Sequence, residues 1–157
     1  MLEKYTLKEV LNQSTEKFAS NLALASVDGI GVKYKELKDK VNSLSSFLKE
    51  QGIIHGDKVA ILSENSVNWG IAYFAITTIG AVAVPVLPDF RDNEVHHILR
   101  HSGCKVIFIS QKQFPKIEEL ESDQVKHLIL IYDFSIIPPE TTIAKLKSTI
   151  SKTTRPL

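Results

Sequence analysis

The sequence has a single cysteine and no excess of charge of either sign. Cys104 cannot form an intramolecular disulfide, which is typical of proteins in the reducing cytoplasm. The 19 basic and 18 acidic residues leave a formal net charge of +1, so no long-range field attracts nucleic acid or an anionic membrane. We therefore expect a cytoplasmic protein that has no nucleic-acid partner.

Long apolar runs are also absent. The longest candidate, "GAVAVPVLP" from Gly80 to Pro88, contains two prolines and is far shorter than the roughly 20 residues that a membrane-spanning helix needs. The first residues, "MLEKYTLKEV", lack the apolar core of a signal peptide. The 157 residues are 43% hydrophobic and 24% charged, which predicts a globular domain without a transmembrane segment.

Glycine is scarce where nucleotide chemistry would need it. The seven glycines are scattered, and none lies beyond Gly103. A phosphate-binding loop needs clustered glycines, because side chains would keep the backbone amides away from the phosphate oxygens. The motifs GxGxxG, GxxxxGKS/T and GxSxG do not occur. We therefore expect no nucleotide cofactor to be bound to this chain alone.

The sequence does contain alternating helix and strand patterns. Apolar residues recur every three or four positions after Thr6, whose hydroxyl can cap a helix together with Glu9. Short extended runs on either side of Asp28 and Gly29 predict a small hairpin. Further helices are predicted over 34–51, 67–79 and 92–102, core strands over 59–62, 81–86, 105–110 and 125–132, and a short helix within 111–124.

This order predicts an α/β fold, a parallel sheet with helices on both faces, preceded by a helix and a small β-hairpin. Pro85 lacks a backbone donor, so it should lie near the end of its strand or at an edge of the sheet. We expect the α/β portion to cover residues 1–135. Residues 136–157 should form a weakly structured helix, from Ile143 to Ile150, and a polar tail.

Ligands of open parallel sheets bind at the carboxyl ends of the strands, which directs attention to three segments. These are "SENSVNW" (63–69), "PVLPDFRDN" (85–93) and "SQKQF" (110–114). Ser66 and Asn65 precede a helix N-terminus that could hold an anion, but capping of that helix explains them more simply. Asp89 and Asp92 could form an acidic pair, but a turn and a helix cap at Asp92 explain both aspartates more simply.

His97, His101 and Cys104 have the spacing of a metal-binding helix edge. The apolar residues of this helix define a buried face, so the two histidines should point to solvent, and the helix should end before Cys104. We therefore predict no metal site here. The neighbouring His96 and Arg100 are expected to be surface residues.

Five motifs follow one another along the chain. They are "VKYKEL" (32–37), "HGDKVAIL" (55–62), "SENSVNW", "GAVAVPVLP" and "DNEVHHILRHSGCKVIFIS" (92–110). Their content and order resemble the amino-terminal part of the adenylate-forming superfamily, in particular the fatty acyl-CoA synthetases. The resemblance runs from Thr6 to Ser110 and continues more weakly to Tyr132. It implies that the fold is part of the large N-terminal domain of such an enzyme.

The resemblance implies a parent enzyme that uses ATP and magnesium to convert a fatty acid to an acyl-adenylate and then transfers the acyl group to coenzyme A. The family's phosphate loop, rich in Ser, Thr and Gly, its nucleotide-binding motifs and its catalytic lysine have no matching positions in this chain. The resemblance thus implies no catalytic, cofactor-binding or metal-binding residue here. We therefore expect an amino-terminal fragment of a fatty acid–CoA ligase that is inactive by itself.

Two other interpretations stay open. A stand-alone α/β binding or regulatory module would explain the alternating elements without further sequence. A truncated pseudoenzyme could instead act as an interaction subunit. A fragment should expose apolar surface, which favours self-association.

Overall fold

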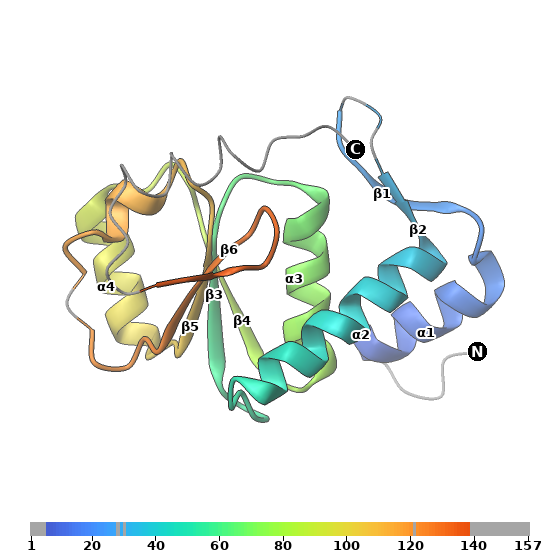
Figure 1. Cartoon of the computed structure of the whole chain (residues 1–157), viewed down its shortest axis with the longest axis horizontal. Coiled ribbons are helices and arrows are strands. Elements are labelled where there is room, and N and C mark those ends of the chain that lie inside the picture. The colour runs from blue at the N-terminus through green and yellow to red at the C-terminus, as the bar shows by residue number, and fades with distance from the viewer. Residues whose placement is uncertain (1–5, 28, 30, 121, 139–157) are drawn as a thin grey trace.

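The computed structural model describes residues 6–27, 29, 31–120 and 122–138, and it has the α/β fold that the sequence predicts (Figure 1). The elements are α1 (Leu7–Phe18), β1 (Leu22–Ala25), β2 (Gly31–Lys33), α2 (Tyr34–Glu50), β3 (Lys58–Leu62), α3 (Val67–Thr78), β4 (Val82–Val86), α4 (Asp92–Ser102), β5 (Val106–Ile109), the 3-10 helix η1 (Phe114–Ile117), β6 (His127–Leu130) and β7 (Ile136–Ile137). Asp28 of the predicted hairpin turn, the predicted helix Ile143–Ile150 and the tail lie outside the described residues.

Five strands form the main sheet in the order β4-β3-β5-β6-β7. The first four are parallel, and β7 pairs antiparallel with β6. The sheet therefore starts at β3, adds β4 on one side and then grows through β5 and β6 on the other. β1 and β2 form the separate antiparallel hairpin. The parallel direction confirms the prediction, and the strand order is a finding of the structure.

Each face of the sheet has its own apolar core. Val59 and Ile61 of β3 pack with α1, α2 and α3, whereas Ala60 and Leu62 pack with α4 and η1. This alternation follows from the period of two in a strand. Figure 1 shows α3 and α4 on opposite sides of the sheet. β3 and β5 are thus covered on both faces, which explains their unbroken apolar runs.

β4 lies at one edge of the sheet, and Val82 at its start is 46% exposed. The N–H of Val82 donates to the carbonyl of Asp57, before β3, at 2.8 Å. Because successive residues direct their backbone groups to opposite sides of a strand, Pro85 faces the free edge, where no ladder donor is needed. The structure therefore confirms the position predicted for Pro85.

The caps of α1 and α3 are side-chain hydroxyls, as predicted. The Oγ1 of Thr6 accepts the N–H of Glu9 at 3.2 Å, and the Oγ of Ser66 accepts the N–H of Trp69 at 3.1 Å. Each bond satisfies a donor that the helix itself leaves unpaired, so these caps fix where the two helices begin.

The start of α4 differs from the prediction. Its N-cap is Arg91, whose N–H donates to the carboxylate of Glu94 at 2.8 Å. Asp92 is the first helical residue, so its prediction as the cap is wrong. Its carboxylate lies instead in the first turn, where the helix dipole favours negative charge. Gly103 ends the helix with a φ of 66°, as predicted.

β7 was not predicted. Phe134 reverses the chain between β6 and β7 with a φ of 60°, which is uncommon for a residue with a side chain. Its ring packs edge-on against Phe108 of the core at a centroid distance of 5.9 Å. A strand of two residues has no sequence period, so only the tertiary structure shows it.

Within the described part of the chain, no helix combines the length and the apolar character needed to cross a membrane.

Candidate functional site

An open hollow of about 510 Å³ lies at the carboxyl ends of β3, β5 and β6. Residues 63–68, 110–112 and 130–132 form most of its wall. The structure thus brings together "SENSVNW" and "SQKQF", two of the three segments that the sequence selects. The third wall, at the end of β6, was missed, although the same carboxyl-end rule applies to that strand.

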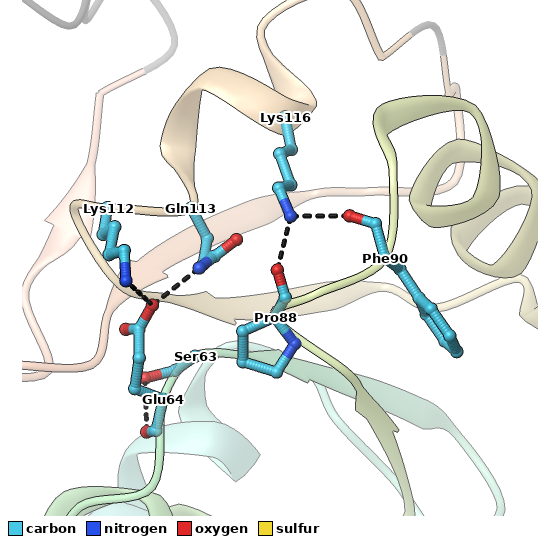
Figure 2. A network of polar contacts seen from close by, with 7 residues as sticks. All are labelled: Ser63, Glu64, Pro88, Phe90, Lys112, Gln113 and Lys116. Atoms are coloured by element: carbon cyan, nitrogen blue, oxygen red, sulfur yellow. Dashed lines mark hydrogen bonds and ion pairs between the residues drawn. The ribbon is translucent and has the colours of Figure 1, made fainter.

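Glu64 is the carboxylate of this hollow. Its Oε1 accepts a hydrogen bond from the Nε2 of Gln113 at 2.6 Å and lies 3.9 Å from the Nζ of Lys112 (Figure 2). Partial burial acts to raise the pKa of Glu64, but its hydrogen bonds, chiefly that from Gln113, and a smaller effect of Lys112 outweigh burial and lower it. Glu64 is therefore ionised at neutral pH, and its carboxylate already has Gln113 and Lys112 as partners.

Asn68, in the first turn of α3, fixes a second side of the hollow. Its Nδ2 donates to the backbone carbonyls of Ile131 at 2.9 Å and Tyr132 at 2.6 Å, just beyond β6. Ser66 caps α3, so its prediction as a capping residue is confirmed. Asn65 lies in the wall of the hollow. The polar residues here mainly hold the strand ends and α3 together.

The donor set of the hollow does not match magnesium or a phosphate chain. Magnesium is usually held by carboxylates together with phosphate oxygens and water, whereas Glu64 is the one carboxylate among the described residues of the wall. Among the described residues, no three His, Cys, Asp or Glu side chains are placed to share a metal ion. Lys112 projects into solvent, with 80% of its side chain exposed. These residues alone therefore do not form a site for magnesium and a nucleoside triphosphate.

"PVLPDFRDN" does not reach the hollow. The Nζ of Lys116, in η1, donates to the backbone carbonyls of Pro88 and Phe90, the latter at 2.6 Å (Figure 2). Asp89 and Asp92 are both exposed. The loop between β4 and α4 is thus held by its backbone, and the acidic side chains take no part in these bonds.

The structure separates Cys104 from the two histidines that share its metal-site spacing. His97 and His101 are exposed, with stacked rings, whereas Cys104 is fully buried, and burial raises the pKa of its thiol. His96 is half-buried, not at the surface as predicted, because its Nε2 lies 2.7 Å from the carbonyl oxygen of Lys116. Only tertiary contact with η1 reveals this role of His96.

Residues 11–156 match the sequence profile of the family described as "AMP-binding enzyme". The 3-oxocholest-4-en-26-oate–CoA ligase of Rhodococcus rhodochrous is 27% identical over 129 residues, which are 81% of this chain and 23% of that protein. The mitochondrial medium-chain acyl-CoA ligase ACSF2 of Rattus norvegicus is 30% identical over 110 residues, 69% of this chain and 18% of that protein. The chain thus spans about a fifth of the length of these relatives.

The solved structures include similar folds. The inhibitor-bound N-terminal domain of FACL13 from Mycobacterium tuberculosis superposes with a TM-score of 0.73 at 27% identity, covering 79% of this chain and 33% of that one. The similarity confirms that the α/β fold of this chain is the fold of part of such an N-terminal domain.

Proposed function

Because the chain belongs to the AMP-binding enzyme family, we propose that it forms the amino-terminal part of the catalytic domain of an ATP-dependent fatty acid–CoA ligase. The observation that carries the proposal is the family match over residues 11–156. The likeness to an N-terminal domain and the order of the five sequence motifs support it.

In the proposed reaction, a carboxylate oxygen of the fatty acid attacks the α-phosphorus of ATP, and pyrophosphate leaves. The sulfur of coenzyme A then attacks the acyl carbon, and AMP leaves. Magnesium would neutralise phosphate charge during the first step. This chain contributes the sheet from β4 to β6, whose ordered strand ends give further parts of the domain a rigid surface to pack on.

The acid that the proposed ligase activates is a separate question from its reaction. The names of the two relatives describe ligases of 3-oxocholest-4-en-26-oate and of medium-chain acyl groups. Both relatives are therefore named as CoA ligases, but the acids in their names differ. We choose a fatty acid because the sequence motifs resemble fatty acyl-CoA synthetases. A panel of medium-chain, long-chain, sterol and aromatic acids separates these possibilities.

Acid-dependent exchange of labelled pyrophosphate into ATP tests the proposed activity. We expect no exchange from the 157-residue chain with any acid of the panel. If the reading frame continues beyond Leu157, we expect the continuous protein to show exchange with fatty acids. Exchange by the short chain would contradict its inactivity, and exchange by the continuous protein with another acid only would contradict the substrate.

We also propose that the chain self-associates. Along α1, Leu7 and Val10 are each 40% exposed, and Phe18 is 49% exposed on the same side of the helix. Leu22, which follows α1, is 61% exposed. Such neighbouring apolar side chains favour burial between molecules. Light scattering at micromolar concentration should show a dimer or larger assembly that Phe18→Ser weakens, and a clean monomer would contradict the proposal.

A further inference from the structure

His97 and His101 lie one turn apart on the exposed side of α4. Their imidazole rings are nearly parallel, with an interplanar angle of 11° and a centroid distance of 5.8 Å. A transition cation bound at about 2.0–2.1 Å to one nitrogen of each ring needs those nitrogens about 3 Å apart. Small rotations of two exposed rings at this separation bring the nitrogens together, because solvent leaves both side chains free to turn.

The side chains around this pair supply no further ligand for the cation. The ring of His96 is held by a backbone carbonyl, and the thiol of Cys104 is buried in the core below α4. Arg100 is exposed beside the pair, but its guanidinium has no lone pair to donate. In the part of the chain that the structure describes, no third His, Cys, Asp or Glu completes a cluster. Water would therefore fill the remaining coordination positions.

The chemistry of the pair selects the class of cation. Neutral imidazole suits nickel, copper and zinc, whereas magnesium and calcium prefer oxygen ligands. His101 also lies in the last turn of α4, where the helix dipole favours positive charge. Although the sequence predicts no metal site with Cys104, we propose that His97 and His101 alone form a two-imidazole chelate for divalent transition cations. This site does not depend on the proposed ligase function, whose cation is magnesium.

Calorimetric titration of the 157-residue chain with Ni²⁺ tests the chelate, and NMR line broadening locates it. We expect one ion bound and selective broadening of α4 resonances. His97→Gln and His101→Gln should each weaken binding by about tenfold or more, since each removes one of two imidazole ligands. Arg100→Gln is the matched control, because it changes an exposed residue of the same helix to the same side chain and should leave affinity undiminished.

Thermal unfolding followed by circular dichroism checks that each variant is folded, which we expect because the changes are at exposed positions. Magnesium in place of nickel should give no heat of binding and no broadening. Undiminished nickel binding in either histidine variant, equal losses in Arg100→Gln, or broadening away from α4 would overturn the proposal. Loss confined to the two histidine variants would support it.

Discussion

The carboxylate of Asp57 lies 2.7 Å from the Nζ of Lys105 and accepts the N–H of Ile54 at 3.0 Å. The ion pair joins the turn before β3 to the residue before β5, two strands that are neighbours in the sheet. The hydrogen bond with Lys105, followed by that from Ile54, lowers the pKa of Asp57. Asp57 belongs to "HGDKVAIL", so the aspartate of this motif has a structural role.

Asp57→Asn should therefore make stability less dependent on pH in the acid range. The pKa of Asp57 is lower in the folded than in the unfolded state, so its stabilisation is present above the unfolded value, about 4, and is lost as the pH falls through the folded value. Because the pair is partly exposed, a double-mutant cycle with Lys105→Met at pH 7 should give about 0.5–1 kcal/mol. A coupling energy that stays constant from pH 7 to pH 2 would refute this account.

The backbone at Gly80 packs against the same turn. Its carbonyl accepts the N–H of Gly56 at 2.9 Å, and a Cβ added to Gly80 would collide with the ring of His55. Gly80 also has a φ of 78°, which strains any residue with a side chain. "HGDKVAIL" and "GAVAVPVLP" therefore meet where their strands begin, although Gly56 and Gly80 are more than twenty positions apart in the sequence.

Gly80→Ala should lower the free energy of unfolding by about 2–4 kcal/mol, since it adds a collision to the left-handed strain. Gly52→Ala is the matched control: its φ is 80°, but an added Cβ meets nothing within 4 Å, so only strain of about 1–2 kcal/mol is expected. In denaturant unfolding, Gly80→Ala should cost less in a His55→Ala background than alone. Equal costs in both backgrounds would argue against the predicted collision.

The sequence predicts the local elements because each has a period or a cap of its own. The helical spacing of Leu37, Val41 and Leu44 and the short apolar runs of β3 and β5 are such patterns, and they establish the α/β class. The cap of α4 was misassigned because Asp92 is a good N-cap residue, whereas the observed start uses the carboxylate of Glu94.

The candidate site is predictable only in part. The carboxyl-end rule selects the segments around Glu64 and Ser110, which do meet, but not the contacts between them. Gln113 reaches Glu64, and Asn68 reaches Ile131, across 49 and 63 positions of sequence, so neither pairing has a local pattern. The strand order places these residues side by side, and composition alone does not determine that order.

Lys116 should contribute more to the free energy of unfolding than the nearby exposed Lys112, because it holds the loop between β4 and α4. Lys116→Met leaves the carbonyls of Pro88 and Phe90 without their charged donor, so we expect a loss of about 1–3 kcal/mol. Lys112→Met removes only an exposed, 3.9 Å contact with Glu64 and should change stability by less than about 0.5 kcal/mol. Denaturant unfolding of both variants measures the difference, and similar effects would show that Lys116 does not clamp the loop.

Pro85 should protect the free edge of β4 from pairing with another molecule. Because Pro85 faces outward and has no N–H, it interrupts the row of donors that a second strand would need. Pro85→Thr restores that donor, and a symmetric pair of edges would regain two hydrogen bonds, so we expect self-association to strengthen by about tenfold or more. Sedimentation velocity over a range of concentrations measures the dissociation constant.

Leu87→Thr separates this edge effect from apolar contact. It removes an exposed apolar side chain just beyond β4, 59% exposed, and leaves the backbone donors unchanged, so it should weaken association or leave it unaltered. The two threonine variants thus differ in the sign of the expected change, although both make the same edge more polar. If Pro85→Thr did not strengthen association, the missing N–H of Pro85 would not be what protects β4. The exposed carbonyls and the side-chain shape of this edge would then have to account for its protection.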